Sequence, residues 1–255
     1  LTAVDWLWLI LLGFGTGTYG VLVGAGGGFI LGPALLIFFD MEPTVVAGTS
    51  LALVAINALS GSQVYRRMGL VDYRSGLLFA AAAIPGAVLA PFILTTVADG
   101  TFRILLGALL LGLAVLMMMR PRAEQAPRKR GSTDRPSRMV RSRRILVSGG
   151  DGYEYWFNEA LAVSFNVLLG FLSSFFGTGG GFLRTPILVY AFNFPVLVAV
   201  ATSVFTIIFY TTAGAITHAS LGHVDWYPTF VWAGIGLVGG AQVGARLAGK
   251  IGNTW

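Results

Sequence analysis

Apolar stretches of about twenty residues recur along nearly the whole chain, and this feature limits the possible folds most. A helix of that length crosses about 30 Å of hydrocarbon. Charged residues make up 11% of the sequence, against about 25% in soluble domains. The polar and apolar alternation that marks a membrane barrel is absent from runs such as FRILLGALLLGLAVLMMM. The sequence therefore predicts an all-α, polytopic bundle of transmembrane helices.

Apolar segments are expected at 3–23, 25–39, 44–64, 75–97 and 101–119, and again at 156–176, 178–192, 196–218 and 227–249. Between the two sets, residues 120–155 are polar, and ten of the seventeen Lys and Arg residues lie between Arg120 and Arg144. Like charges mixed with Pro, Gly and Ser resist packing, so this stretch is predicted to be a mobile loop. The positive-inside rule places it in the cytoplasm. The predicted organisation is a first transmembrane repeat over 1–119, a basic cytoplasmic linker over 120–155 and a second repeat over 156–255.

The two halves of the chain carry the same pattern. GAGGGFILGP begins at Gly24 and GTGGGFLRTP begins at Gly177, an offset of 153 residues. The same offset aligns further pairs: Thr49-Ser50 with Thr202-Ser203, Val71-Asp72 with Val224-Asp225, and Gly86 with Gly239. This agreement predicts an internal duplication. The fifth segment of the first repeat would recur at 254–272, whereas the sequence given ends at Trp255. Two alternatives remain: a tenth helix is missing from this sequence, or the second repeat is one element short and its last helix is absent.

The distribution of Lys and Arg, together with an odd number of net membrane crossings in each repeat, predicts that the second repeat is inverted in the membrane. With the basic loop in the cytoplasm, Arg66, Arg67 and Arg74 fall on the same side, and the matching loop of the second repeat, THASLGHVD, contains no Lys or Arg. A parallel arrangement would place Arg246 and Lys250 outside, and it is the alternative.

The motif glycines are expected to interrupt buried helices and to give Gly-broken or re-entrant segments, since each Gly costs about 0.8–1.0 kcal/mol relative to Ala in a helix interior. A break frees backbone N–H groups at the start of the next segment, near Phe29 and Phe182. Two such N-termini meeting in a water-accessible cavity near the membrane midplane would bind a small anion. The alternative is that the glycines only permit close packing, as the spacing of Gly236, Gly240 and Gly244 does.

The predicted substrate-binding residues are those of the two motifs and of the Thr-Ser pairs: Gly24, Gly26, Gly27, Gly28, Phe29, Thr49, Ser50, Gly177, Thr178, Gly179, Gly180, Gly181, Phe182, Arg184, Thr202 and Ser203. Hydroxyls in such segments also bond back to their own helix. Arg184 aligns with Leu31, and its insertion cost of about 2.5–3.5 kcal/mol indicates that it faces a cavity or partner rather than lipid. The alternative for this arginine is snorkelling to headgroups.

Other polar positions are expected to be structural. Asp72 and Asp225 precede apolar segments and resemble helix N-caps. His218 and His223 are expected at the surface, near an outer helix end. Asn57 lies in an apolar segment, and it either lines the path or bonds between helices, as is expected of Gln63 and Gln242.

The duplicated G-x-G-G-G-F, its spacing to Pro, the Thr-Ser pair and the G-x-V-D-aromatic pattern resemble the sulfite exporter TauE/SafE family, also called the toluene sulfonate uptake permeases. The family's signature falls on Gly24, Gly26, Gly27, Gly28, Pro33, Thr49 and Ser50, and on Gly177, Gly179, Gly180, Gly181, Pro186, Thr202 and Ser203. The resemblance implies a prokaryotic inner-membrane secondary transporter for small sulfur-containing or organic anions such as sulfite, sulfonates or sulfoacetate.

The functional prediction is a carrier that moves such an anion across the cytoplasmic membrane by alternating access. A passive anion channel is the nearer alternative, and a membrane-embedded enzyme is the more distant one, because the sequence contains no HExxH motif and no nucleophile paired with a base. The expected partners are the anion and the lipid bilayer, with no nucleic acid, cofactor or metal. Proton coupling and a homo-oligomeric state are left open.

Overall fold

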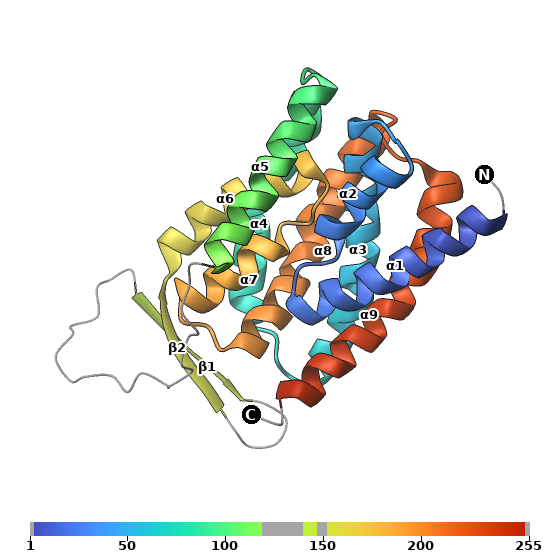
Figure 1. Ribbon diagram of the computed structural model, residues 1–255. Helices are drawn as coiled ribbons and strands as arrows, with labels where there is room; N and C mark the ends of the chain where they lie inside the picture. The colour runs from blue at the N-terminus through green and yellow to red at the C-terminus, as the bar shows by residue number, and fades with distance from the viewer. Residues whose placement is uncertain (1–2, 119–139, 147–151, 253–255) are drawn as a thin grey trace.

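The computed structural model describes residues 3–118, 140–146 and 152–252, and these residues are almost entirely helical (Figure 1). The first half contains α1 (Ala3–Val23), α2 (Gly28–Phe38), α3 (Pro43–Arg67), α4 (Tyr73–Leu94) and α5 (Asp99–Met118). The second half contains β1 (Val140–Leu146), β2 (Gly152–Asn158), α6 (Glu159–Phe176), α7 (Gly181–Tyr190), α8 (Val196–Ser220), the short turn η1 (Trp226–Phe230) and α9 (Val231–Gly252).

Six of the described helical segments are long and apolar enough to cross a membrane: α1, α3, α4, α6, α8 and the segment from Trp226 to Lys250. By contrast, α2 has 11 residues and α7 has 10. At about 1.5 Å per residue such helices span roughly half of a 30 Å hydrocarbon layer. The chain is therefore a multi-pass membrane protein in which two half-length helices accompany the full-length ones.

The helix boundaries repeat at the offset found in the sequence. α1 ends at Val23 and α6 ends at Phe176, while α2 begins at Gly28 and α7 at Gly181. α3 and α8 likewise match at both ends, and η1 begins where the offset from α4 predicts. Among the described residues, α5 has no counterpart in the second half. The predicted duplication is thus present in the secondary structure as well as in the sequence.

The two corresponding helices α3 and α8 pack against each other in the centre of the molecule (Figure 1). The Asp225 amide, just after α8, donates to Thr49 Oγ1 near the start of α3, at 2.8 Å. The Asp72 amide, just after α3, donates to Thr202 Oγ1 near the start of α8, at 3.0 Å. The start of each helix therefore lies beside the end of the other, so α3 and α8 run in opposite directions.

The outer helices of the two halves are exchanged: α1 lies along α9, and α6 lies along α4 (Figure 1). Small residues let these backbones approach closely. A Cβ on Gly17 would lie 2.8 Å from the Leu237 carbonyl oxygen, and a Cβ on Gly86 would lie 2.6 Å from that of Val167. The packing role predicted for Gly240 holds too, because a Cβ there would contact the backbone of Phe14 and Thr18.

Part of the predicted linker is structured, which corrects the expectation of a mobile loop through residue 155. β1 and β2 form an antiparallel pair in which Val140 faces Asn158 and Leu146 faces Gly152. Phe157 at the end of β2 is buried, and its ring packs against Phe192 and Phe194. Phe157 thus anchors this hairpin to the bundle. Residues 120–139, which hold most of the basic charge, lie outside the described residues.

Helix ends follow local rules only in part. The Asp72 carboxylate accepts a hydrogen bond from the Ser75 amide at 3.1 Å, so the predicted cap of α4 is confirmed. Asp225 does not cap η1 with its side chain. Its carboxylate instead accepts a 2.6 Å hydrogen bond from the Thr229 hydroxyl, which competes for the same oxygen atoms.

Candidate functional site

Both glycine motifs interrupt the helical backbone in the same way. Each break contains three glycines with a positive φ at matching positions: Gly24, Gly26 and Gly27 at 79°, 77° and 88°, and Gly177, Gly179 and Gly180 at 67°, 79° and 64°. Residues with a Cβ rarely adopt this conformation, so glycine is needed at these positions. The predicted breaks are confirmed, and they separate α1 from α2 and α6 from α7.

The two breaks contact each other directly. A Cβ on Gly28 would lie 2.6 Å from the Gly177 carbonyl oxygen, and Gly181 lies in the equivalent way against the Gly24 carbonyl. The Phe29 and Phe182 rings stack across this contact with centroids 5.6 Å apart. Every residue of Gly24–Gly28 and Gly177–Gly181 is buried. In this conformation the breaks are therefore in direct contact and closed to solvent.

Unpaired amides nevertheless lie at both breaks. The first backbone N–H groups of a helix have no partner within the helix. Among the described residues, no hydrogen bond is formed by the amides of Gly28 and Phe29 in α2, or by those of Gly181 and Phe182 in α7. These buried amides carry the positive end of each helix dipole, which favours a negative charge.

The predicted hydroxyl residues divide into two groups. The Ser203 hydroxyl donates to the Gly24 carbonyl oxygen at 2.8 Å, so it lies at the first break. The Ser50 hydroxyl donates back to the Val46 carbonyl within its own helix, although it also lies beside Gly177. Thr49 and Thr202 instead hold the loops that follow α8 and α3, away from the glycines. The structure thus brings Ser50 and Ser203 to the breaks, where Thr178 also lies, whereas Thr49 and Thr202 bond elsewhere.

Arg184 is 1% exposed, so it faces the protein interior and does not snorkel. Its Nε donates to Asn166 Oδ1 at 2.8 Å, and its Nη1 donates to Tyr210 Oη at 3.1 Å. The guanidinium also lies over the Tyr210 ring, 4.8 Å from the centroid, and its Nη2 has no partner. Within the part of the chain that the structure describes, no carboxylate lies within ion-pair distance of this cation. A buried positive charge therefore stands beside the second break without a counter-charge.

A matching side chain supports each break. Asn57 Nδ2 donates to the Gly26 carbonyl oxygen at 2.8 Å, and Tyr210, at the corresponding position of α8, donates its hydroxyl proton to the Gly179 carbonyl. Asn57 was a predicted polar position, whereas Tyr210 and Asn166 were missed. The sequence feature that could have identified Tyr210 is its alignment with Asn57 at the 153-residue offset. Gln242, also predicted to bond between helices, donates to the Ser60 carbonyl oxygen at 2.8 Å.

His218 is fully buried, which corrects the expectation of a surface position. The last turn of α8 packs on α6, where His218 Nε2 lies 3.0 Å from the Ser174 carbonyl oxygen. Its Nδ1 lies 3.1 Å from Nδ1 of His223, which is partly buried in the following loop. Tyr65, the counterpart of His218, donates its hydroxyl proton to the Val21 carbonyl in the same manner. The sequence feature that could have predicted the burial of His218 is its alignment with Tyr65, an aromatic residue inside a helix.

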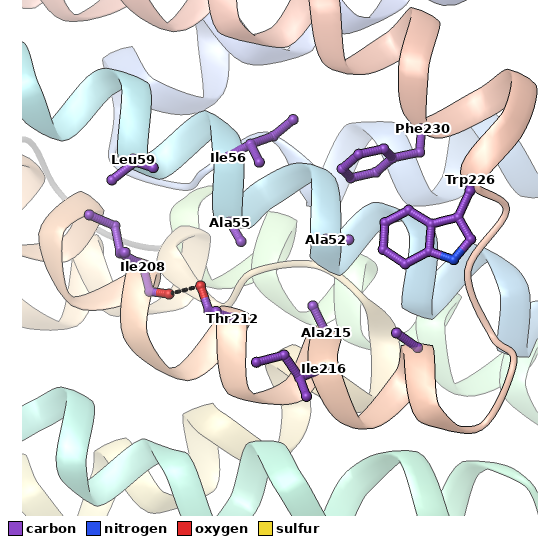
Figure 2. Close-up of a pocket in the computed structure, with 11 residues that line it drawn as sticks. Ala52, Ala55, Ile56, Leu59, Ile208, Thr212, Ala215, Ile216, Trp226 and Phe230 are labelled. Carbon is purple, nitrogen blue, oxygen red and sulfur yellow. Dashed lines mark hydrogen bonds between the residues drawn. The ribbon is translucent and has the colours of Figure 1, made fainter.

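A separate groove lies between α3, α8 and η1, with a volume of about 220 Å³ (Figure 2). Its lining includes Ile56, Ile216, Trp226 and Phe230, and the hydroxyl of Thr212 is already bonded to the Ile208 carbonyl. The groove is lined almost entirely by apolar side chains and contains no charged residue, so it is a poor site for an anion. No cluster of three or more His, Asp or Glu side chains able to hold a metal ion occurs in the described ranges.

Comparison with known proteins agrees with this architecture. The chain is 30% identical over 250 residues to "Probable membrane transporter protein YunE" of Bacillus subtilis, covering 95% of this chain and 87% of that protein. It is 30% identical over 239 residues to a "Probable membrane transporter protein" of Xylella fastidiosa (strain 9a5c), covering 93% and 81%. It is also 25% identical over 258 residues to "Probable membrane transporter protein MJ0441" of Methanocaldococcus jannaschii, covering 95% and 86%. No solved structure matches the chain. Residues 9–255 match the sulfite exporter TauE/SafE family, and the chain belongs to that family of membrane transporters.

Proposed function

We propose that the protein is a secondary transporter that carries a small anion across the cytoplasmic membrane by alternating access. The substrate class is a sulfur-containing or organic oxyanion such as sulfite, a sulfonate or sulfoacetate. The observation that carries the proposal is the buried guanidinium of Arg184, which has no counter-charge among the described residues and lies beside a helix break. Burying an uncompensated charge costs several kcal/mol, and binding an anion would offset that cost.

The arrangement of the two halves supports alternating access. Inverted repeats commonly place a solute site where interrupted helices meet near the midplane. The antiparallel course of α3 and α8, and the reciprocal contact of the two breaks, fit an inverted pair. The closed breaks then represent an occluded conformation, and glycines with positive φ provide the flexibility to open on either side. In this proposal the basic residues 120–139 face the cytoplasm.

Flux through proteoliposomes tests the proposal. Uptake of sulfite or of a simple sulfonate should saturate and show counterflow. An exchange of Arg184 for Gln should raise the apparent KM, because a hydrogen bond to a charged group contributes about 1.5–3 kcal/mol, or roughly 10- to 150-fold in affinity.

Arg103→Gln is the matched control. Arg103 is partly exposed, and its guanidinium lies 3.7 Å from Asp40 at the surface, so the same loss of charge should leave the flux unchanged. An unsaturable current would identify a channel, and chemical conversion of the substrate would identify an enzyme. Equal KM values for wild type and Arg184→Gln would refute the assignment of Arg184.

A further inference from the structure

Buried polar atoms without partners gather at the second break. In the described portion of the chain four of the eight such atoms lie on the end of α6, the break itself or the first turn of α7: Ser173 Oγ, Ser174 Oγ, Thr178 Oγ1 and Arg184 Nη2. At the first break the unpaired atom is Asn57 Oδ1, which is an acceptor. Most buried polar groups in proteins are hydrogen-bonded, because leaving one unpaired costs free energy. A concentration of unpaired groups in twelve consecutive residues, 173–184, therefore calls for a ligand or another explanation.

The first break shows that the fold does not need these groups. At the 153-residue offset the four positions are Gly20, Val21, Ala25 and Leu31, none of which has a polar side chain. The backbone of the first break nevertheless has the same three positive-φ glycines and the same half-length helix after it. Since the break forms equally well with apolar side chains, the polar ones in the second copy are not explained by folding.

The side chains that carry two of the unpaired atoms, Ser173 and Arg184, approach the same surface around Gly180. A Cβ on Gly180 would lie 3.0 Å from Ser173 Cβ and 3.2 Å from Tyr210 Oη. Tyr210 Oη is the acceptor for Arg184 Nη1 at 3.1 Å, which brings the guanidinium to this surface. Ser174 points elsewhere, because its Oγ lies 2.7 Å from the position of a Cβ on Gly214 in α8.

The side chains at this surface offer a positive charge and hydrogen-bond donors. Arg184 contributes one fixed positive charge, since a guanidinium stays protonated in proteins. Its Nη2 and the Ser173 hydroxyl both offer hydrogen atoms, while Asn166 and Tyr210 already occupy Nε and Nη1. No carboxylate of the described residues lies within 4 Å of the guanidinium to accept a proton from a ligand.

We propose that the anion binds at the second break only, beside Gly180, with Arg184 Nη2 and the Ser173 hydroxyl as its donors, and that its class is a monoanion presenting acceptor oxygens alone. The assignment rests on the transport function proposed above and specifies its site. It narrows the substrate class to monoanions such as simple sulfonates, so sulfoacetate, which carries two charges, is no longer included. Atoms about 3 Å from the Cβ position of Gly180 leave no room for an anion in the closed conformation. Binding therefore requires α7 to move away from α6 at the glycines between them.

Equivalent substitutions in the two copies test the asymmetry. Purified full-length protein is titrated with methanesulfonate, a monoanion, and with sulfate, a dianion of similar size, and binding is read from thermal shift and calorimetry. Arg184→Met should weaken methanesulfonate binding by roughly a hundredfold, and Ser173→Ala by roughly tenfold. Leu31→Met, at the position equivalent to Arg184, and Ser174→Ala, at the neighbouring serine, should leave the affinity within about twofold.

The unliganded protein provides a second readout. Because Ser173 Oγ has no partner, Ser173→Ala should keep or raise the thermal midpoint without anion while it weakens binding. A purely structural role for the hydroxyl would lower the midpoint instead, which would overturn the assignment.

The outcomes also separate the site from the function. Equal losses of methanesulfonate affinity in Leu31→Met and Arg184→Met, or wild-type affinity in Ser173→Ala, would overturn the assignment of the site to the second break. This holds even if sulfite flux is saturable. Tighter binding of sulfate than of methanesulfonate, or binding of neither, would overturn the monoanion class. Absence of saturable flux for every anion in proteoliposomes would overturn the transport function itself.

Discussion

The direct contact between the two breaks leads to a quantitative prediction for Gly28→Ala. The new Cβ would lie 2.6 Å from the Gly177 carbonyl oxygen and 2.9 Å from the Thr178 carbonyl carbon. Ordinary C···O contacts are about 3.3–3.6 Å, so the opposite backbone would have to retreat by roughly 0.7–1 Å. Gly28 does not have a positive φ, and backbone strain therefore does not contribute.

The expected loss of stability follows from the cost of overpacking. One extra carbon in a tightly packed site typically costs about 1–3 kcal/mol, and backbone atoms cannot rotate away as a side chain can. Helix propensity contributes little at the first residue of a helix, since the gain of up to about 1 kcal/mol applies to interiors. For a chain of this size about 1 kcal/mol corresponds to roughly 2–4 °C, so the thermal midpoint should fall by roughly 2–12 °C.

The measurement is thermal unfolding in detergent, followed by tryptophan fluorescence at a fixed scan rate. Gly112→Ala is the control, because a Cβ on Gly112 in α5 would meet no atom within 4 Å; its midpoint should stay constant or rise. Gly28→Ala and Gly112→Ala variants that unfold within about 1 °C of each other would show that the breaks do not touch, and would refute the reasoning.

The histidine pair and the threonine bonds give two further predictions. Burial lowers the pKa of His223, so below the ordinary histidine pKa of about 6.5 the folded state binds fewer protons than the unfolded state. The midpoint of thermal unfolding should therefore be constant above about pH 7 and fall towards pH 5. His223→Gln should reduce that fall. Since the chain has two histidines, imidazole ¹⁵N NMR on protein with a histidine-free tag should also find His218 protonated on Nε2, because its partner there is a carbonyl oxygen. Parallel pH profiles of the wild type and His223→Gln, or a His218 protonated on Nδ1 alone, would contradict these expectations. Thr202→Val removes the acceptor of the Asp72 amide and should cost about 1–3 kcal/mol, whereas Thr212→Val, whose hydroxyl bonds only its own helix, should be nearly neutral in the same unfolding assay.

The sequence predicted the helical segments well, because apolar length and the glycine duplication are local features. Every predicted segment corresponds to a helix, and both breaks occur at the predicted glycines. The hairpin of β1 and β2 was missed because basic residues dominated the composition of that stretch, while the anchoring of Phe157 depends on two rings from the loop after α7.

The candidate site was less accessible to sequence reasoning. The glycines and Arg184 were found from their pattern and from their cost in a membrane. Their partners Asn166 and Tyr210 come from other helices, and only tertiary packing identifies them. The burial of His218 and the closed contact between the breaks likewise depend on how α6 and α8 meet, which no local signal records.

The exchange of outer helices has a consequence for how the protein is made. α1 finds its partner in α9, so Gly17 meets a residue, Leu237, that is synthesised 220 positions later. Until the ribosome has produced nearly the whole polypeptide, the close-packing face of the first helix has only lipid or insertion machinery to cover it. Each half should accordingly be unstable when expressed alone, and the two halves should become resistant to proteolysis only when they are produced together.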